Sequence, residues 1–225
     1  MPTKLGHIAD GVIVVTCLFV FGSTVYRAQR STVVVDAAKA EFIENWRDLV
    51  PHGIPYGSDS AQVTIIEFGD LECSACRRFS TRIKDLEKKY GKDLALVFVH
   101  YPLSQHRFAI PAARALECAA QQGETRKLFD LIYEKQDSIG LKEWESYATE
   151  AGVPNPVAVT LCIKSSHTFR RIETGLSLGP KVAVRGTPTF VVNGWRLAPN
   201  DKFSESVDLI MNGKQPYDDF KRRAY

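Results

Sequence analysis

Two cysteines are separated by two residues in the run Cys73-Ser74-Ala75-Cys76. The run lies between a segment typical of a buried strand and a segment typical of a helix. The run 63–68 before them is β-branched and aromatic, which favours a strand. After them, apolar residues recur at helical spacing over 79–86. A cysteine at a helix N-terminus meets unpaired N–H groups and the positive end of the helix dipole. The sequence therefore predicts that Cys73 is an exposed, ionised thiol and that Cys76 lies within reach for a disulfide.

Cysteine pairs at this spacing also occur in zinc sites and in structural disulfides. A zinc site needs a second Cys or His pair at comparably short spacing. The other cysteines, Cys17, Cys118 and Cys162, are isolated in the sequence, and no histidine pair supplies the missing half. We therefore expect redox chemistry, with no metal ion and no cofactor other than a Cys73–Cys76 disulfide. An inert structural disulfide at this pair stays open as the alternative.

The charge of the chain gives no indication of a nucleic-acid partner. The formal net charge is +3 over 225 residues, and basic residues alternate with acidic ones along the chain. Proteins that bind a phosphate backbone usually gather their basic residues in a stripe or patch. We therefore expect no nucleic acid among the partners.

The first 30 residues differ in character from the rest. Gly11–Val25 is apolar and uncharged, although a bilayer span takes roughly 17–20 apolar residues. We interpret residues 1–30 as an uncleaved membrane anchor, while a cleaved signal segment and a buried core helix stay open. The cysteines beyond it favour an oxidising compartment, although the flanking Lys and Arg residues weakly favour the opposite orientation. The sequence thus predicts a bacterial cell-envelope protein, N-terminally anchored, on the periplasmic or extracytoplasmic side of the inner membrane.

The remaining chain divides into a lead-in over 31–56 and a domain over 57–225. The lead-in carries a helical pattern over 36–50, followed by a turn-rich stretch over 51–58. The domain opens with a strand, a helix and a strand, a βαβ unit. The predicted elements are strands over 63–68 and 94–99 around a helix over 74–90, helices over 107–122, 125–137, 141–151, 155–164 and from 167, short strands within 187–194 and 195–197, and a helix over 201–212.

Several separate runs resemble the DsbA-like branch of the thioredoxin superfamily. These runs are residues 67–76 around the cysteine pair, 100–103 with His106, 115–119, and 185–190 with its Gly-Thr-Pro-Thr-Phe. The resemblance covers roughly residues 57 to 213. It implies an α/β fold with a mixed sheet, namely a thioredoxin fold with a helical insertion at about 107–184, preceded by the N-terminal transmembrane or signal segment.

The resemblance gives each matched position a role. Cys73 is expected to be the nucleophile of disulfide exchange and Cys76 the buried resolving thiol. A cis-proline, Pro188, together with Thr187, is expected to present backbone to an extended substrate segment. Glu67 corresponds to a buried acid of raised pKa that shuttles the proton of Cys76. Strand parity alone leaves Glu67 open as a half-buried edge residue.

The resemblance also implies a second cysteine pair and a moderate oxidising strength. Some members carry a disulfide at positions comparable to Cys118 and Cys162, although two separate free thiols stay open. The strongest oxidants of the family carry a histidine between their active-site cysteines, where this chain has Ser74 and Ala75. We therefore expect a milder oxidant than DsbA itself.

Three polar residues near the motif are expected to contribute no catalysis. Asp70 and Glu72 are interpreted as exposed loop acids, whose negative charge would oppose ionisation of Cys73. His106 follows the second predicted strand, on a loop that can approach the motif, and we interpret it as a surface or core histidine.

Two functions follow for the chain. The first is an extracytoplasmic thiol–disulfide oxidoreductase that exchanges disulfides with cysteines of exported proteins and is recycled by a membrane redox partner. Oxidation of substrates is favoured over reduction, which stays open. The second is a non-catalytic peptide-binding or chaperone module that uses the surface beside Pro188.

Overall fold

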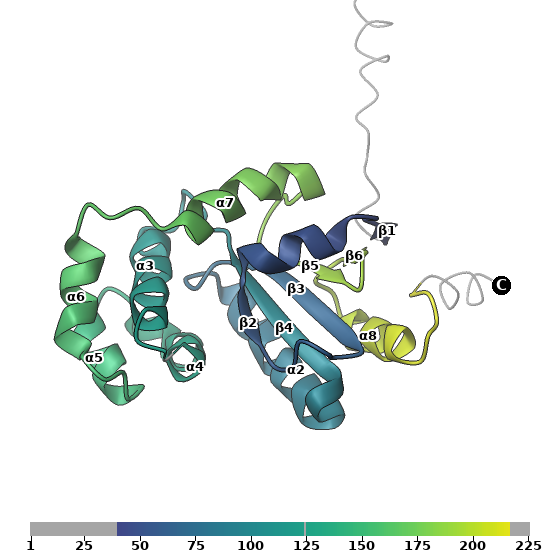
Figure 1. Ribbon diagram of the computed structural model, residues 1–225, viewed down its shortest axis with the longest axis horizontal. Helices are drawn as coiled ribbons and strands as arrows, with labels where there is room; N and C mark the ends of the chain where they lie inside the picture. The colour runs from purple at the N-terminus through teal and green to yellow at the C-terminus, as the bar shows by residue number, and fades with distance from the viewer. Residues whose placement is uncertain (1–39, 124, 217–225) are drawn as a thin grey trace, which may run out of the picture. The chain divides into compact units, whose positions relative to one another are not determined.

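The computed structural model describes residues 40–123 and 125–216 (Figure 1). The predicted anchor or signal segment over residues 1–30 lies outside these ranges. Within them, none of the helices combines the length and the apolar character that crossing a bilayer requires. The boundaries of the lead-in and of the domain stay predictions.

A six-stranded mixed sheet in the order β1-β6-β5-β3-β4-β2 forms the centre of the molecule. Its two long strands, β3 (Val63–Gly69) and β4 (Leu94–His100), run parallel and are joined by helix α2 (Ser74–Tyr90) and the 3-10 turn η2 (Gly91–Asp93). A parallel pair needs such a crossover. Strand β5 (Thr189–Val192) pairs antiparallel with β3, and β6 (Trp195–Leu197) pairs antiparallel with β5.

Both faces of the sheet are covered by other elements, and alternate side chains of β3 pack into the core on each face. Val63 and Ile65 pack in the larger core with α2, with α8 (Phe203–Met211) and with the helical insertion. Ile66 and Phe68 pack on the opposite face against η1 (Trp46–His52) and η4 (Gly179–Val182). This alternation follows from the two-residue period of a strand. Glu67 therefore lies on the same face of the sheet as helix α2.

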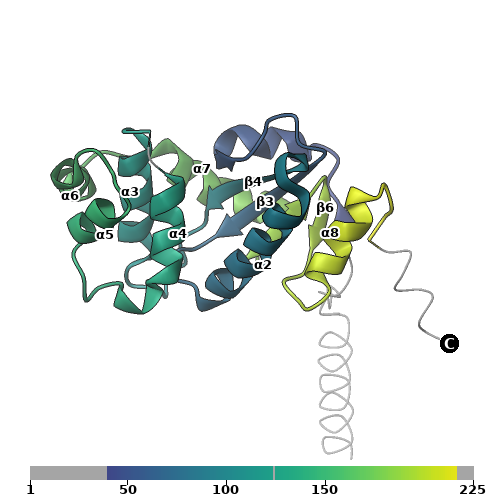
Figure 2. The ribbon, with the colours of Figure 1, turned by 90° about the horizontal axis from the view of Figure 1, so that it is seen from below.

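The insertion between β4 and β5 is mainly helical in its described residues, as predicted, with one isolated β-bridge between Ile139 and Lys142. Figures 1 and 2 show α3 to α6 gathered beside one end of the sheet, with α7 reaching back across it. Gly175 lets α7 pack closely against the end of β4, because a Cβ at this position would lie 2.0 Å from the carbonyl oxygen of His100. The elements are α3 (Ala109–Ala120), α4 (Arg126–Glu134), η3 (Gln136–Ser138), α5 (Trp144–Glu150), α6 (Pro156–Lys164) and α7 (Arg170–Leu178).

Two predictions for the segment before the βαβ unit are wrong in part. Of the helical pattern expected over 36–50, residues 36–39 lie outside the described residues, β1 (Glu41–Phe42) is a short strand paired with β6, and the 3-10 helix η1 begins at Trp46. The turn-rich stretch over 51–58 contains β2 (Ile54–Tyr56), the edge strand opposite β1, which pairs antiparallel with β4. Pro55 is tolerated there because β2 is an edge strand. Local sequence signals indicated a turn, whereas pairing with β4 makes the segment a strand.

Candidate active site

Cys73 is the N-cap residue of α2, and a short turn over residues 70–72 joins it to the end of β3. Its backbone N–H donates to the carbonyl of Asp70 at 3.0 Å, and its own carbonyl accepts from the N–H of Arg77 at 3.1 Å. The unpaired N–H groups of the first helical turn therefore surround the sulfur, which favours its ionised form.

A side chain from the insertion holds this turn in place. Gln136 in η3 is buried, and its Nε2 donates to the carbonyls of Leu71 at 2.9 Å and Cys73 at 3.1 Å. Gln136 thus gives the Leu71 carbonyl a donor and gives the Cys73 carbonyl a second donor beside the N–H of Arg77. A buried carbonyl without a donor is unfavourable. Sequence analysis missed Gln136, because no local pattern signals a contact across some sixty residues.

The Thr187–Pro188 loop lies opposite the first cysteine. The peptide bond between these residues is cis, and the thiol of Cys73 donates to the carbonyl oxygen of Thr187 at 3.3 Å. Sheet pairing explains the approach: Thr189, the first residue of β5, is in register with Phe68 near the end of β3. The structure thus brings Cys73, Thr187 and Pro188 together.

The surroundings of Cys73 favour the thiolate. Its pKa is lowered from 9.0 to about 5, chiefly by a hydrogen bond from the Cys76 thiol; burial opposes this effect, and the Thr187 side chain and the N–H groups of Cys76 and Ala75 reinforce it. The buried Thr187 hydroxyl has no hydrogen-bond partner among the described residues while Cys73 is a neutral thiol. The hydroxyl can therefore donate to the Cys73 thiolate.

The prediction that Cys73 is exposed is wrong. The residue is only 8% exposed, because the Thr187 carbonyl and the turn held by Gln136 lie against it. A reacting partner must therefore approach along one open side.

The second cysteine and the acid beneath it have the opposite character. Cys76 and Glu67 are both fully buried. Burial, then the hydrogen bond with Cys73 and the charge of Glu67, raise the pKa of the Cys76 thiol well above its ordinary value. Burial raises the pKa of Glu67 from 4.5 to about 8; the charge of Cys73 adds to this effect and the Cys76 thiol opposes it. A carboxyl that titrates near neutral pH is suited to exchange a proton with Cys76.

The prediction that Asp70 and Glu72 are exposed loop acids is wrong. Asp70 is 2% exposed and accepts from the N–H groups of Glu72 and Leu103 at 2.8 Å. Its Oδ2 also lies 2.7 Å from Nδ1 of His106. Glu72 is partly buried and accepts from the N–H of Phe108. Both acids therefore fasten the turn before Cys73 to the loop after β4.

Cys118 and Cys162 are joined in a disulfide that links α3 to α6, at a sequence separation of 44. In the loop-entropy description a bridge of this span stabilises a fold by roughly 4 kcal/mol. The bridge lies within the helical insertion and does not contact the active-site pair, which consists of free thiols.

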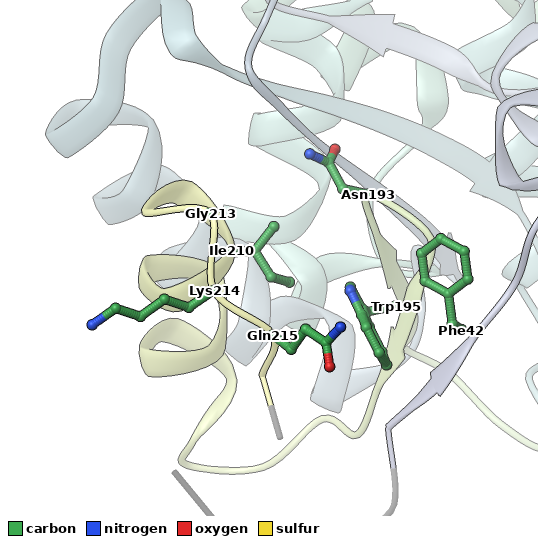
Figure 3. Close-up of a pocket in the computed structure, with 7 residues that line it drawn as sticks. All are labelled: Phe42, Asn193, Trp195, Ile210, Gly213, Lys214 and Gln215. Carbon is green, nitrogen blue, oxygen red and sulfur yellow. The ribbon is translucent and has the colours of Figure 1, made fainter. Parts of the chain in front are cut away.

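No other site in the described ranges competes with this one. Within residues 40–123 and 125–216, no group of three or more His, Cys, Asp or Glu side chains is placed to hold a metal ion. A cavity of about 470 Å³ lies between β6 and α8. Phe42, Trp195 and Ile210 are among the residues that line it (Figure 3). None of the predicted site residues lines it.

A family model described as Thioredoxin matches residues 50–212, and the chain belongs to this thioredoxin family. Family, fold and paired free thiols together define a thioredoxin-like protein with a DsbA-like fold. Oxidised BdbD from Bacillus subtilis has a TM-score of 0.64 and 21% identity over 73% of this chain and 95% of its own. For α-DsbA1 of Wolbachia pipientis the TM-score is 0.60 and the identity 20%, over 72% and 92% of the two chains.

Curated relatives match only in part. The Na(+)/H(+) antiporter NhaA 1 of Mycolicibacterium gilvum is 32% identical over 142 residues, which is 62% of this chain and 23% of the antiporter. The chain therefore spans less than a quarter of the length of this relative. The antiporter's name describes that whole protein, of which the matched region is only a part.

Proposed function

We propose that the protein oxidises cysteine pairs of exported proteins through a Cys73–Cys76 disulfide. The observation that carries the proposal is the contrast between the two thiols beside the Thr187 backbone. The pKa of Cys73 is lowered to about 5 and that of Cys76 is raised. A stabilised thiolate favours the reduced form of the protein, so its disulfide readily accepts electrons.

The reaction takes two exchange steps. A substrate thiolate attacks the Cys73 sulfur, the Cys73–Cys76 bond breaks, and Cys76 leaves and takes a proton for which Glu67 is the nearest acid. A second substrate thiolate then attacks the substrate sulfur of the mixed disulfide and releases Cys73 as a thiolate. Two electrons pass from substrate to protein. Of the two substrate thiol protons, one ends on Cys76 and the other in solvent.

The substrate segment is proposed to lie extended along the Thr187–Pro188 backbone. The 3.3 Å contact between Cys73 Sγ and the Thr187 carbonyl supports this placement, since a sulfur bound to Cys73 would lie beside the same backbone. The Cys118–Cys162 disulfide supports an oxidising compartment. We accordingly propose an N-terminally anchored protein at the extracytoplasmic side of the membrane, recycled by a membrane redox partner.

Trapping tests the chemistry directly. In Cys76→Ser, with Cys73 first converted to its mixed disulfide with glutathione, the thiolate of a reduced, unfolded exported protein that has one cysteine attacks the Cys73 sulfur and glutathione leaves as its thiolate. Neither Cys76 nor a second substrate thiolate can resolve the new mixed disulfide, so we expect reductant-sensitive adducts. Cys73→Ser is the matched control and should yield none. Equal adducts in both variants would contradict the roles assigned to the two thiols.

The reduction potential tests the direction. We expect a value between those of thioredoxin, about −270 mV, and DsbA, about −120 mV, because the dipeptide Ser74-Ala75 lacks a histidine. A value near or below that of thioredoxin would make the protein a reductase.

A peptide-binding module without catalysis is the second candidate, and the 8% exposure of Cys73 favours it. Alkylation of the reduced protein discriminates between the two. The enzyme has one reactive thiol at pH 6, whereas a module with a shielded, un-ionised Cys73 has none.

A further inference from the structure

A histidine reaches the active-site turn from a different part of the chain. The dipeptide between the cysteines, Ser74-Ala75, supplies no cation. His106, in the loop between β4 and α3, lies with Nδ1 2.7 Å from Oδ2 of Asp70. The carbonyl of Asp70 in turn accepts the N–H of Cys73 at 3.0 Å. One residue thus contacts both the imidazole and the backbone of the nucleophile.

The orientation of the imidazole is fixed by buried contacts. The Asp70 side chain is fully buried and also accepts from the N–H groups of Glu72 and Leu103, so the carboxylate cannot rotate away. His106 keeps 26% of its side chain exposed. With Nδ1 committed to Asp70, Nε2 is the nitrogen left to face solvent or a reacting partner. A carboxylate that orients a partly exposed imidazole beside a nucleophile is a recurrent catalytic arrangement.

The charges around His106 favour its protonated form. Burial opposes the cation, but the hydrogen bond to Asp70 and the negative charges of Asp70, Cys73 and Glu72 outweigh it, so the pKa of His106 is raised above its ordinary value of 6.5. These three groups are the charges that act on the imidazole. Electrostatic interaction is mutual, so the same proximity lowers the energy of the Cys73 thiolate.

We infer that His106, oriented by Asp70, is the positioning residue that neutralises the acids before the motif and stabilises the Cys73 thiolate. This inference rests on the proposed function and names the residue that replaces the missing histidine of the dipeptide. In the second exchange step the bond between Cys73 and the substrate sulfur breaks, and the electron pair stays on Cys73. His106 stabilises that leaving thiolate without giving up its proton.

The substitution His106→Gln tests the inference, because glutamine retains a donor to Asp70 and removes the charge. We expect the ionisation constant of Cys73 to fall by roughly 1.5-fold to fivefold, the size that partly exposed charge pairs give. The readout is thiolate absorbance of the reduced protein against pH. His106→Arg keeps a cation and should restore most of the loss. His167→Gln, at an exposed position in the insertion, is the matched control and should leave the constant unchanged.

The pH dependence separates an electrostatic role from a structural one. Because the pKa of His106 is raised, its cation persists above pH 6.5 and is lost at higher pH. The difference in reduction potential between parent and His106→Gln should therefore be largest near pH 6 and shrink as the pH rises and the imidazole loses its proton. A variant that loses only thermal stability, with the Cys73 ionisation constant unchanged, would overturn the inference. An ordinary thiol pKa in the parent protein would instead overturn the proposed function.

Discussion

The buried carboxyl of Glu67 predicts a pH-dependent stability that one substitution should remove. Its pKa is raised from 4.5 to about 8, with burial as the main cause. Below pH 4.5 the carboxyl is protonated in both the folded and the unfolded state. As the pH rises to 8 only the unfolded state ionises, so stability is lost over this window. Each pH unit corresponds to about 1.4 kcal/mol, and the whole window to roughly 4–5 kcal/mol.

The perturbation is Glu67→Gln, measured by urea unfolding of the reduced protein between pH 4 and pH 8. Glutamine leaves a buried amide whose effect does not depend on pH. The difference in free energy of unfolding between variant and parent should therefore stay flat below pH 4.5 and then rise in favour of the variant, by about 1.4 kcal/mol per unit, until pH 8. Glu134→Gln on the exposed face of α4 is the matched control.

A difference that stays constant from pH 4 to pH 8 would refute this reasoning. It would mean that Glu67 ionises alike in the folded and unfolded states and is not available as a proton donor to Cys76 near neutral pH.

Three further perturbations follow from contacts at the site and in the insertion. Replacing Cys118 and Cys162 together by alanine should lower the free energy of unfolding by roughly 4 kcal/mol in urea denaturation, while the active-site titration stays unchanged. Thr187→Val removes the hydroxyl available to the thiolate and should raise the pKa of Cys73 by about one unit; an unchanged titration curve would show that the hydroxyl does not donate. Gln136→Leu removes the amide donor of the Leu71 carbonyl and one of the two donors of the Cys73 carbonyl, which keeps the N–H of Arg77. It should destabilise the fold by roughly 1–3 kcal/mol, and a neutral result in urea would mean that water replaces the amide.

The βαβ unit was predictable from the sequence because its signals are local. The β3 strand carries a β-branched and aromatic run, and α2 shows helical periodicity beside the cysteine pair. Strand β2 was not predictable in this way. Its three residues include Pro55 and follow a turn-rich run, and only pairing with Phe98, Val97 and Leu96 of β4 makes them a strand.

The active site likewise contains residues that the sequence indicated and contacts that it did not. The resemblance indicated Cys73, Cys76, Glu67 and the Thr187–Pro188 pair, and the structure places them together. The contacts that position them come from side chains reaching backbone far away in the sequence, such as Gln136 to the Cys73 carbonyl and Asp70 to the Leu103 N–H. Neither periodicity nor motif spacing encodes such contacts.

The same contacts explain why exposure was misjudged. A cysteine at a helix start is exposed in isolation, but here Gln136 and the Thr187 loop cover it. Acids next to a thiol would repel its charge if they were free in solvent, whereas Asp70 and Glu72 are each bound by N–H donors. Their effect on Cys73 therefore depends on partners that a linear reading does not show.

The most direct measurement of the central claim is thiol-specific alkylation of the reduced protein as a function of pH, with mass spectrometry to identify the modified residue. Cys73 should be the thiol that reacts first, with an apparent pKa of about 5, and Cys76 should stay unmodified through neutral pH because its own pKa is raised. A midpoint for Cys73 near the ordinary thiol value of 9.0, or modification of Cys76 ahead of Cys73, would contradict it.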